Sequence, residues 1–533
     1  MSRKEEAPQS GVTSVINGRE NMQHHLWLKI VLGIVAVLVL LAAFFLFIKP
    51  WYELIQAKKL STEGSPTAQY ADLMPDTDEI YQTVEDLVDM GPRTPGTPAG
   101  DTAKEYVVSR LEELGLSDIE VIPAETDLWQ CDDWSLTVGD TEISSYFMRH
   151  TFNDGSYGSF STPADGLETE IVYVGKGRAS DFKNVDVKGK IVVSDVTFTS
   201  VPIALAKAAS YCYYDPEGTM SLFSSRTNPY SPDTYPYNYF RAMEAGAAGF
   251  VGILTSYIDS NEYNNEDYSY LGSDMAIPGL WVTKSDGETI KSLIAEAKKG
   301  GGAATAVLSM KGSLERIQAG AVVGFLPGRS DEIIMVHSHY DSVTPGAVED
   351  ASGTSVVLAI AEFYSQIPAS EREKTLMFTL MDTHFSDYDS HDAVVARYFN
   401  GDYDILADVC IEHIALEAEE KDGAFELTGE VEPRIVFISP SKALIQITKE
   451  EMVRQDLDRT VILAATIFGD EVPTDADMFY AEGVPIISLI SGPIYLYDNM
   501  DTIDKVAKDE LKPTAQAYAD IIWRMMKLNA SEF

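Results

Sequence analysis

The stretch "DEIIMVHSHYDSVTPGAVEDASGTSVVLAIAEF", residues 331–363, decides the fold. Its apolar run at 333–336 predicts a buried strand, and the apolar positions from 354 to 363 predict a helix. Between them, Pro and Gly predict a loop, and two His, two Asp and one Glu lie in or next to it. Open α/β sheets hold their sites at the carboxyl ends of strands, so the stretch predicts a candidate metal site there.

From residue 320 to the C-terminus, short apolar strand patterns alternate with helix patterns. This alternation predicts an α/β domain, a three-layer sandwich whose largely parallel sheet is covered on both faces. Residues 130–312 differ, because short β-rich runs with many Gly and Tyr replace most helix patterns. Within them, the Tyr- and Pro-rich segment 209–240 is expected either to pack against a neighbouring domain or to line a substrate cleft.

Composition excludes several classes of protein. A chain of 533 residues is too long for one ordinary domain, and 45% hydrophobic residues exclude global disorder. The formal net charge of −43 argues against nucleic acid as a partner, because phosphate binding needs a basic surface. The three cysteines, Cys131, Cys212 and Cys410, are too scattered to predict a disulfide framework or a cysteine-type zinc site.

A long apolar run lies near the N-terminus. Ile30–Ile48 has 19 residues without a polar side chain, about 28 Å as a helix, which predicts a transmembrane helix. The run is longer than a usual signal-peptide core and has no small-residue cleavage site, so an uncleaved anchor is favoured over a cleaved signal. A small excess of Lys and Arg before the run predicts a single-pass topology with a cytoplasmic N-terminus and an extracytoplasmic C-terminal ectodomain.

Five of the eight histidines fall between residues 337 and 413. They lie at or just beyond predicted strand ends: His337, His339, His384, His391 and His413. A hydrolytic zinc centre needs imidazole and carboxylate ligands from separate strands, an open position for water and a general base. The sequence supplies these residue types at the edge of the sheet where a metal site is expected.

The stretch 331–363 resembles the first metal-binding segment of the zinc aminopeptidase family that includes aminopeptidase Y and glutamate carboxypeptidase. Residues 90–116 are similar to the N-terminal helices of that family, and 474–493 and 498–506 to its closing segments, while 165–312 resemble the protease-associated domain often inserted in it. The expected parts are a cytoplasmic tail 1–29, a transmembrane helix 30–48, a linker 49–76, an N-terminal part of the peptidase domain 77–130, an inserted protease-associated-like domain 131–312 and the main part of the peptidase domain 313–533.

The resemblance carries three ligand positions onto this chain. His339 falls on the family's first zinc ligand, Glu349 on the bridging Asp, with Asp350 beside it, and Glu412 on the Asp that completes the ligands of the first zinc. Glu in place of Asp keeps the charge and the oxygen donors and moves them by about one methylene. The resemblance therefore implies zinc, as one or two ions, held by His339, Glu349 and Glu412.

The second half of the family pattern is different in this chain. His384 stands at the position of the general base, Phe385 at that of a ligand to the second zinc, and Tyr497 at that of the last histidine ligand. Phe cannot bind zinc, and a neutral Tyr is a poor ligand. The presence of a second zinc is therefore in doubt.

Three hypotheses remain open. In the first, the three carried-over ligands hold one metal ion, and His384 serves as the general base or as a fourth ligand. In the second, a one-residue gap makes His384 a ligand, and His413 or Asp498 helps to rebuild a second metal site. In the third, the site is lost and the ectodomain binds without cutting.

The remaining candidates have weaker support from the pattern. Because side chains alternate along a strand, His413 is expected to face away from Glu412. His391, about two helical turns after His384, is expected at the surface. Asp475 and Asp477 lie where the family binds substrate and are expected to receive the ammonium group of a peptide. The predicted function is a membrane-anchored extracytoplasmic metallopeptidase that removes N-terminal residues from peptides, and the alternative is a catalytically inactive binding ectodomain.

Overall fold

The computed structural model describes residues 64–268, 271–272, 274–421, 424–469 and 471–533, together with isolated positions between 37 and 55. The predicted transmembrane helix 30–48 lies almost entirely outside the described residues. Among the residues that are described, no helix is both long and apolar enough to cross a membrane. The chain divides at residue 56, and residues 57–533 form one compact unit whose fold is described here.

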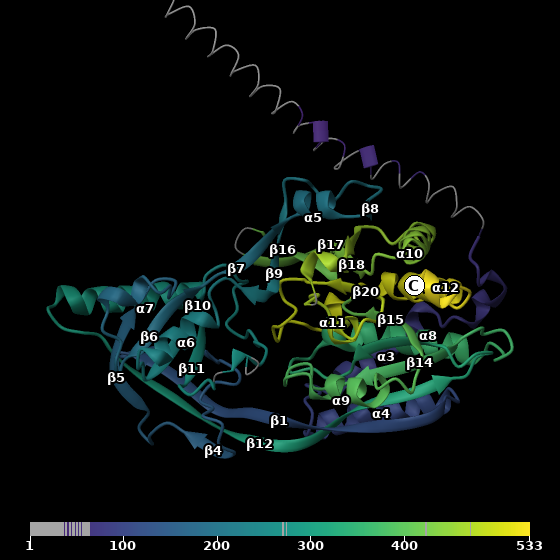
Figure 1. Cartoon of the computed structure of the whole chain (residues 1–533). Helices are drawn as coiled ribbons and strands as arrows, with labels where there is room; N and C mark the ends of the chain where they lie inside the picture. The colour runs from purple at the N-terminus through teal and green to yellow at the C-terminus, as the bar shows by residue number, and fades with distance from the viewer. Residues whose placement is uncertain are drawn as a thin grey trace, which may run out of the picture. The chain divides into compact units, whose positions relative to one another are not determined.

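A mixed, mostly parallel sheet forms the centre of this unit (Figure 1). Its strands, in spatial order, are β12 (Thr305–Leu326), β14 (Thr375–Met381), β13 (Ile333–His339), β15 (Ile405–Ile411), β20 (Ile486–Ser491), β18 (Arg434–Ile438) and β19 (Thr460–Ala464). The four strands β14, β13, β15 and β20 pair in parallel, as do β18 and β19, whereas β12 and β18 run antiparallel to their neighbours in that group. The predicted α/β architecture with a largely parallel sheet is confirmed.

Apolar side chains cover both faces of this sheet. Along β13, Ile334 and Val336 belong to the core beneath the helices α3 (Thr77–Asp89), α8 (Gly353–Ser365) and α12 (Lys508–Met525). On the opposite face, Ile333 and Met335 pack with residues of α9 (Asp389–Tyr398) and α11 (Asp477–Ala481). This two-sided burial explains why β13 is a continuous apolar run instead of an alternating one.

Helix α8 follows directly from the sequence of its segment. Its apolar residues lie on every side, and nearly all of them are buried, because α8 packs against both the sheet and the neighbouring helices α3 and α12.

The N-terminal helices show capping signals in their sequence. The carboxylate of Asp76 accepts hydrogen bonds from the first turn of α3, and Thr97 caps α4 (Pro98–Glu113).

A second part of the unit lies between two long strands. β1 (Ser117–Val138) and β12 pair antiparallel along almost their whole length and connect the central sheet to this part (Figure 1). Its own strands are β5 (Leu167–Tyr173), β6 (Ile191–Val196), β10 (Gly249–Leu254) and β11 (Gly279–Thr283), which pair in parallel, with the helices α6 (Tyr237–Glu244) and α7 (Lys284–Lys299). A separate core, which includes Ile191 and Val251, holds it together.

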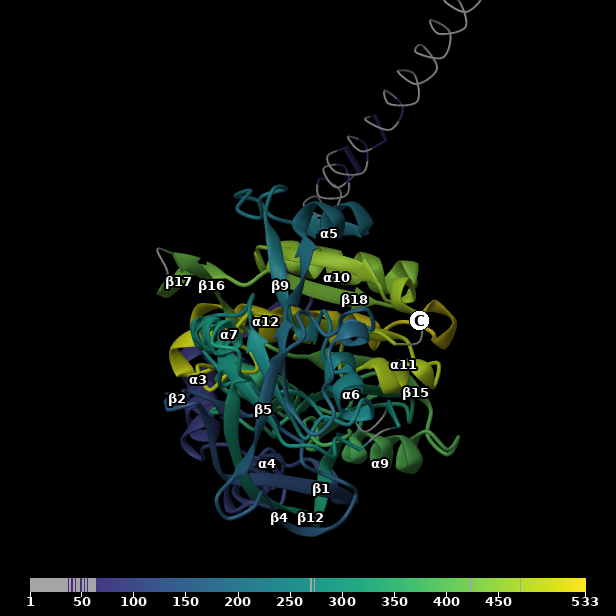
Figure 2. The same cartoon turned by 90° about the vertical axis from the view of Figure 1, so that its left-hand side faces the viewer.

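The Tyr-rich segment of the sequence reaches back from this second part to the central sheet. Strands β7 (Phe198–Pro202) and β9 (Ser225–Pro232) form an antiparallel hairpin, with α5 (Ile203–Ala209) and the short β8 (Cys212–Tyr214) between them (Figure 1). Figure 2 shows β9 and α5 from another side. β8 extends the central sheet by pairing antiparallel with β19. The hairpin is also held by an ion pair between Arg226 and Glu417, at the start of the neighbouring β16 (Leu416–Lys421). The expectation that this segment packs against a neighbouring part of the fold is therefore confirmed, and Tyr230 reaches the candidate metal centre described below.

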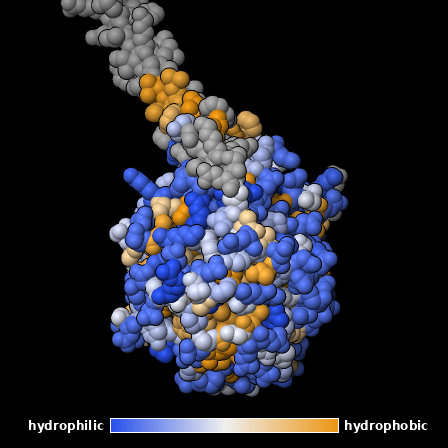
Figure 3. Space-filling view, turned by 90° about the vertical axis from the view of Figure 1, so that its right-hand side faces the viewer, coloured by the Kyte–Doolittle hydropathy of each residue, from blue (hydrophilic) through white to orange (hydrophobic). Residues whose placement is uncertain are grey.

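The surface reflects the acidic composition of the chain. The face shown in Figure 3 is covered mainly by hydrophilic residues, with smaller apolar areas between them. Such a surface agrees with the formal net charge of −43.

Candidate metal centre

The loop after β13 is held in place by a buried arginine. Arg93 is fully buried, and its guanidinium donates hydrogen bonds to the carbonyl oxygens of Tyr340 at 2.8 Å, Pro345 at 2.9 Å and Gly346 at 2.8 Å. Gly346 has a φ of 59°, and a Cβ there would lie 2.4 Å from the carbonyl oxygen of Glu349, so the turn requires glycine. These contacts fix the path of the chain from His339 to Glu349.

Two overlapping groups of side chains can each hold a metal ion. His339, Glu349 and His413 form one group, and His339, His384 and Asp475 form the other; in each group, one potential ligand atom per residue lies within 4.8 Å of the others. All five residues are buried. They come from the ends of β13, β14 and β15 and from the loops before α8 and α11, so parallel strands bring them to one edge of the sheet, as predicted.

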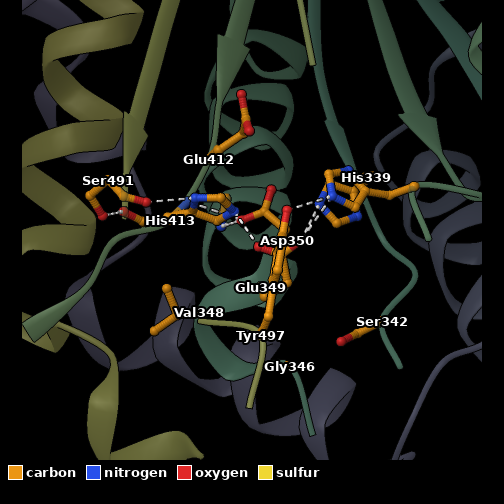
Figure 4. Close-up of polar contacts among 12 residues, drawn as sticks. His339, Ser342, Gly346, Val348, Glu349, Asp350, Glu412, His413, Ser491 and Tyr497 are labelled. Carbon is orange, nitrogen blue, oxygen red and sulfur yellow. Dashed lines mark hydrogen bonds and ion pairs between the residues drawn. The ribbon is translucent and has the colours of Figure 1, made fainter. Parts of the chain in front are cut away.

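Glu349 lies at the centre of the first group. Its Oε1 is 3.4 Å from His339 Nε2 and 3.3 Å from His384 Nε2, and its Oε2 is 2.6 Å from His413 Nε2. Figure 4 shows Glu349 between His339 and His413. Three imidazoles therefore face one carboxylate in a space from which water is largely excluded.

Asp475 plays the same part in the second group. Its Oδ1 is 3.2 Å from His384 Nδ1, and its Oδ2 is 3.9 Å from His339 Nε2 and 3.8 Å from His391 Nε2. The rings of His339 and His384 stack with their centroids 4.3 Å apart. His384 thus bridges the two carboxylates through its two ring nitrogens.

A second layer of contacts orients two of the imidazoles. His339 Nδ1 is 3.0 Å from the carboxylate of Asp341, which leaves Nε2 directed at the cluster. His413 Nδ1 is 2.8 Å from the carbonyl oxygen of Ser491 and 3.1 Å from the hydroxyl of Tyr230, so its Nε2 also faces Glu349. Partners of this kind fix the tautomer of a metal-binding histidine.

The donor atoms of the cluster lack ordinary hydrogen bonds. Among the described residues, no hydrogen-bond partner of suitable geometry is present for these buried atoms: His339 Nε2, both carboxylate oxygens of Glu349, His384 Nδ1, His413 Nε2 and Asp475 Oδ2. Buried polar atoms are rarely left so, and a cation held by either group would satisfy the donor atoms of that group together. Imidazole and carboxylate are common zinc ligands, so the residues present fit a zinc ion.

The electrostatics of the cluster favour positive charge. Burial alone would lower the pKa of His413, but the charge of Glu349 raises it to about 10. Burial likewise opposes the charge on His384, and Asp475 contributes most to raising its pKa to about 9. Glu349 shows the opposite effect, because its imidazole neighbours hold its pKa well below the usual range against the effect of burial. The cluster of side chains thus stabilises a cation at its centre.

The structure places the other candidates around the cluster and not in it. Glu412 belongs to neither group: its Oε1 accepts hydrogen bonds from Thr474 Oγ1 at 2.7 Å and from Cys410 Sγ at 3.0 Å, and Figure 4 shows its carboxylate pointing away from Glu349. Asp350 accepts a hydrogen bond from the backbone N–H of His413 at 3.1 Å, and this contact fixes the backbone of His413 next to the cluster.

Three more candidates lie further along the chain. Tyr497 donates a hydrogen bond to Glu266 at 2.7 Å, and its hydroxyl is 3.4 Å from His384 Nε2. Asp498 is buried and accepts from the backbone N–H of Met500, outside both groups. Asp477, at the start of α11, lines a cavity next to the cluster.

The expectation that Glu412 and His413 face apart is met, but it is His413 and not Glu412 that faces the cluster. β15 ends at Ile411, and the φ of His413 is 55°. The expectation for a second histidine is wrong. His391, expected at the surface, is fully buried in α9 behind Asp475. If the sequence had shown that the strand ends before His413, an inward-facing side chain could have been predicted for it. No local signal marks Asp475 as a partner of His384.

Comparisons with known proteins give the same fold. The sequence model of peptidase family M28 matches residues 321–383. Aminopeptidase YwaD of Bacillus subtilis (strain 168) is 23% identical over 348 residues, which is 61% of this chain and 61% of that protein. The chain therefore spans about three-fifths of the length of this relative.

Solved structures resemble the chain over a larger part of its length. A peptidase M28 precursor from Shewanella amazonensis SB2B matches with a TM-score of 0.63 and 18% identity, over 90% of this chain and 97% of that one. The zinc aminopeptidase BSAP of Bacillus subtilis matches with a TM-score of 0.57 and 17% identity, over 86% and 98% of the two chains. In sequence over residues 321–383 the chain is similar to peptidase family M28, and in fold over most of its length it is similar to a zinc aminopeptidase and to a peptidase M28 precursor, as its sequence predicts.

Proposed function

We propose that the protein is a zinc-dependent exopeptidase of the aminopeptidase type. The observation that carries this proposal is the convergence of buried imidazole and carboxylate atoms, without hydrogen-bond partners among the described residues, beside a cavity of about 640 Å³. Similarity to aminopeptidases in sequence and fold supports the same reaction class. Peptides are the proposed substrates.

The ligand set proposed for the ion is His339, Glu349 and His413. Two histidines and a glutamate are a set found in catalytic zinc sites, which keep one position open. Zinc in such a site supplies a Lewis acid that polarises the scissile carbonyl and lowers the pKa of water. This set replaces Glu412 of the first hypothesis by His413, since the carboxylate of Glu412 is held by Thr474.

His384 is the proposed general base. Its Nε2 lies 3.3 Å from Glu349 Oε1 and borders the cavity, while its Nδ1 faces Asp475 at 3.2 Å. Asp475 would orient the ring and stabilise its protonated form. A cation bound beside the ring would favour its neutral form at the start of the reaction, so that Nε2 could accept a proton from water and return it to the leaving amine. In a two-metal alternative, His384 and Asp475 would instead hold a second ion together with His339.

Zinc content tests the proposal most simply. Purified full-length protein is expected to retain about one zinc per chain after gel filtration, and His413→Gln is expected to lose it. The control is His150→Asn, since His150 is also buried but lies in the second part of the unit beside Asp267. Full zinc content in His413→Gln would exclude His413 as a ligand.

Catalysis is tested on aminoacyl p-nitroanilides. His384→Gln is expected to keep its zinc and to lose at least about a hundredfold in kcat, the lower range for a positioned acid–base group. Bound zinc without hydrolysis of any anilide or peptide would favour the alternative of a catalytically inactive binding ectodomain. Phe385 and Tyr497, which replace two of the family's zinc ligands, also favour that alternative.

Two further features belong to the proposal. The apolar run Ile30–Ile48 would anchor the chain in a membrane, with the peptidase outside the cytoplasm. The part from 131 to 312 would be a protease-associated-like domain, on the resemblance of its sequence. Extraction only by detergent, and not by alkaline carbonate, is the expected outcome for the anchor, and release by carbonate would contradict it.

A further inference from the structure

A cavity of about 640 Å³ opens beside the candidate metal centre. His384, Asp475 and Tyr497 line the end of it that adjoins the cluster. Its other lining residues come mainly from the second part of the unit, between Tyr230 and Leu271, and from the segment 472–478, and they are completed by Asp387, Tyr388, Glu412 and Ile490. The volume is within the range of sites that enclose a small ligand, so the cavity has room for an amino-acid side chain next to the centre.

Tyrosine dominates the wall of this cavity. Six tyrosines contribute to it: Tyr230, Tyr235, Tyr237, Tyr268, Tyr388 and Tyr497. Aromatic rings give an apolar surface for the methylene groups of a side chain, and their faces attract cations. A lining of this kind suits a long side chain that ends in a positive charge.

The charged groups of the wall are all acidic apart from His384. Glu266, Asp387 and Asp477 join the carboxylates already described, and no Lys or Arg is among the described residues of the lining. Glu266 accepts a hydrogen bond from the hydroxyl of Tyr497, and neither Glu266 nor Asp477 is in an ion pair with Lys or Arg among the described residues. Both carboxyl groups are thus available to pair with a cationic ligand.

These observations exclude two kinds of occupant. An acidic side chain would meet acidic groups across the cavity, which is unfavourable. A purely apolar side chain would bury carboxylates without a partner, which is also unfavourable. A guanidinium or ammonium on a long apolar stem fits both the charge and the tyrosine surface.

We propose that this cavity selects peptides whose N-terminal residue is arginine or lysine, with the cationic side chain held among the tyrosines by Glu266 and Asp477. That the occupant is the N-terminal residue of a peptide rests on the proposed function. The selectivity for a cationic side chain depends only on the residues that line the cavity.

Citrulline provides a matched probe, because it has the shape of arginine and the same α-ammonium group but no side-chain charge. With zinc-loaded full-length protein, kcat/KM for arginine p-nitroanilide is expected to exceed that for citrulline p-nitroanilide at least tenfold. Asp477→Asn and Glu266→Gln are each expected to lower this ratio at least threefold. Asp140→Asn, in an exposed turn of the second part, is the control and is expected to leave it unchanged.

Binding is measured as well as hydrolysis, so that a failure of the cavity's selectivity can be distinguished from a failure of the proposed peptidase function. Arginine amide is expected to bind at least tenfold more tightly than citrulline amide by calorimetry, in wild type and in His384→Gln. Selective binding without any hydrolysis would support the cavity and reject the peptidase. Equal binding of the two amides, or equal kcat/KM for the two anilides, would overturn the inference while leaving the peptidase intact.

Discussion

Removing one hydroxyl group, in Tyr230→Phe, tests whether the second part of the unit completes the metal centre. Tyr230 lies in β9, and its hydroxyl is 2.8 Å from the carbonyl oxygen of Ser491 and 3.1 Å from His413 Nδ1. Its ring also packs edge-on against Tyr497, with the centroids 5.6 Å apart. Phe keeps that packing, so the substitution isolates the polar contact with a proposed zinc ligand.

The size of the effect follows from what remains after the substitution. His413 Nδ1 still has the carbonyl oxygen of Ser491 at 2.8 Å, so the ring keeps one of its two partners. The ring of His413 thus loses one hydrogen-bond partner, about 1 kcal/mol, which corresponds to about a fivefold weaker affinity for zinc. The other contact of the hydroxyl, with the carbonyl oxygen of Ser491, does not involve the ring. Mutation of a partner that orients a metal ligand typically costs about tenfold to a hundredfold in affinity, so a fivefold loss, with one partner kept, is small for such a change but measurable.

The assay is competition for zinc against a chromophoric chelator at fixed pH and ionic strength, followed by the melting temperature in excess chelator. Tyr230→Phe is expected to bind zinc about fivefold more weakly and to melt within a few degrees of the wild type once zinc is removed. Tyr157→Phe serves as control, because the hydroxyl of Tyr157 contacts Asp127 at an exposed position. Unchanged zinc affinity in Tyr230→Phe, or an equal loss in the control, would refute the reasoning.

Three other predictions test separate parts of the structure. Arg93→Met leaves several buried carbonyl oxygens without donors, so the free energy of unfolding in urea should fall by about 3 kcal/mol, whereas Arg110→Met at the surface should change it by less than about 0.5 kcal/mol; similar losses would contradict the role of Arg93. Glu412→Gln should keep zinc bound within about threefold of wild type, since its carboxylate is outside both groups, and loss of zinc by elemental analysis would make Glu412 a ligand. Burial raises the pKa of Glu432 to about 7 in spite of its arginine neighbours, so the folded state binds this proton more tightly than the unfolded state does. Stability should therefore fall as pH rises from about 4.5 to about 7, by up to about 3 kcal/mol, and Glu432→Gln should remove that part of the pH dependence of unfolding; an unchanged profile would contradict it.

The sequence predicts the sheet and its edge well for a physical reason. Fully buried parallel strands are short apolar runs, and their carboxyl ends meet at one edge, so the pattern of residues is enough to place His339 and His384 together. The loop between β13 and α8 carries its own signals in Pro and Gly, which locate Glu349.

The ligand set could not be predicted to the same degree. Glu412 and His413 lie just beyond the end of β15, where the φ of His413 is 55°, so the periodic pattern of the strand does not say which of them faces the cluster. Asp475 reaches His384 from a loop much later in the chain, and Tyr230 reaches His413 from another part of the unit. Contacts of this kind are set by packing of distant elements and leave no local signature.

The location of zinc itself is the most direct test of the proposed centre. Crystals of the zinc-loaded full-length protein, measured at the zinc absorption edge, should give an anomalous peak about 2.0–2.2 Å from His339 Nε2, His413 Nε2 and a carboxylate oxygen of Glu349. A peak held by Glu412 without His413, or the absence of any peak between these side chains in protein that hydrolyses peptides, would contradict it.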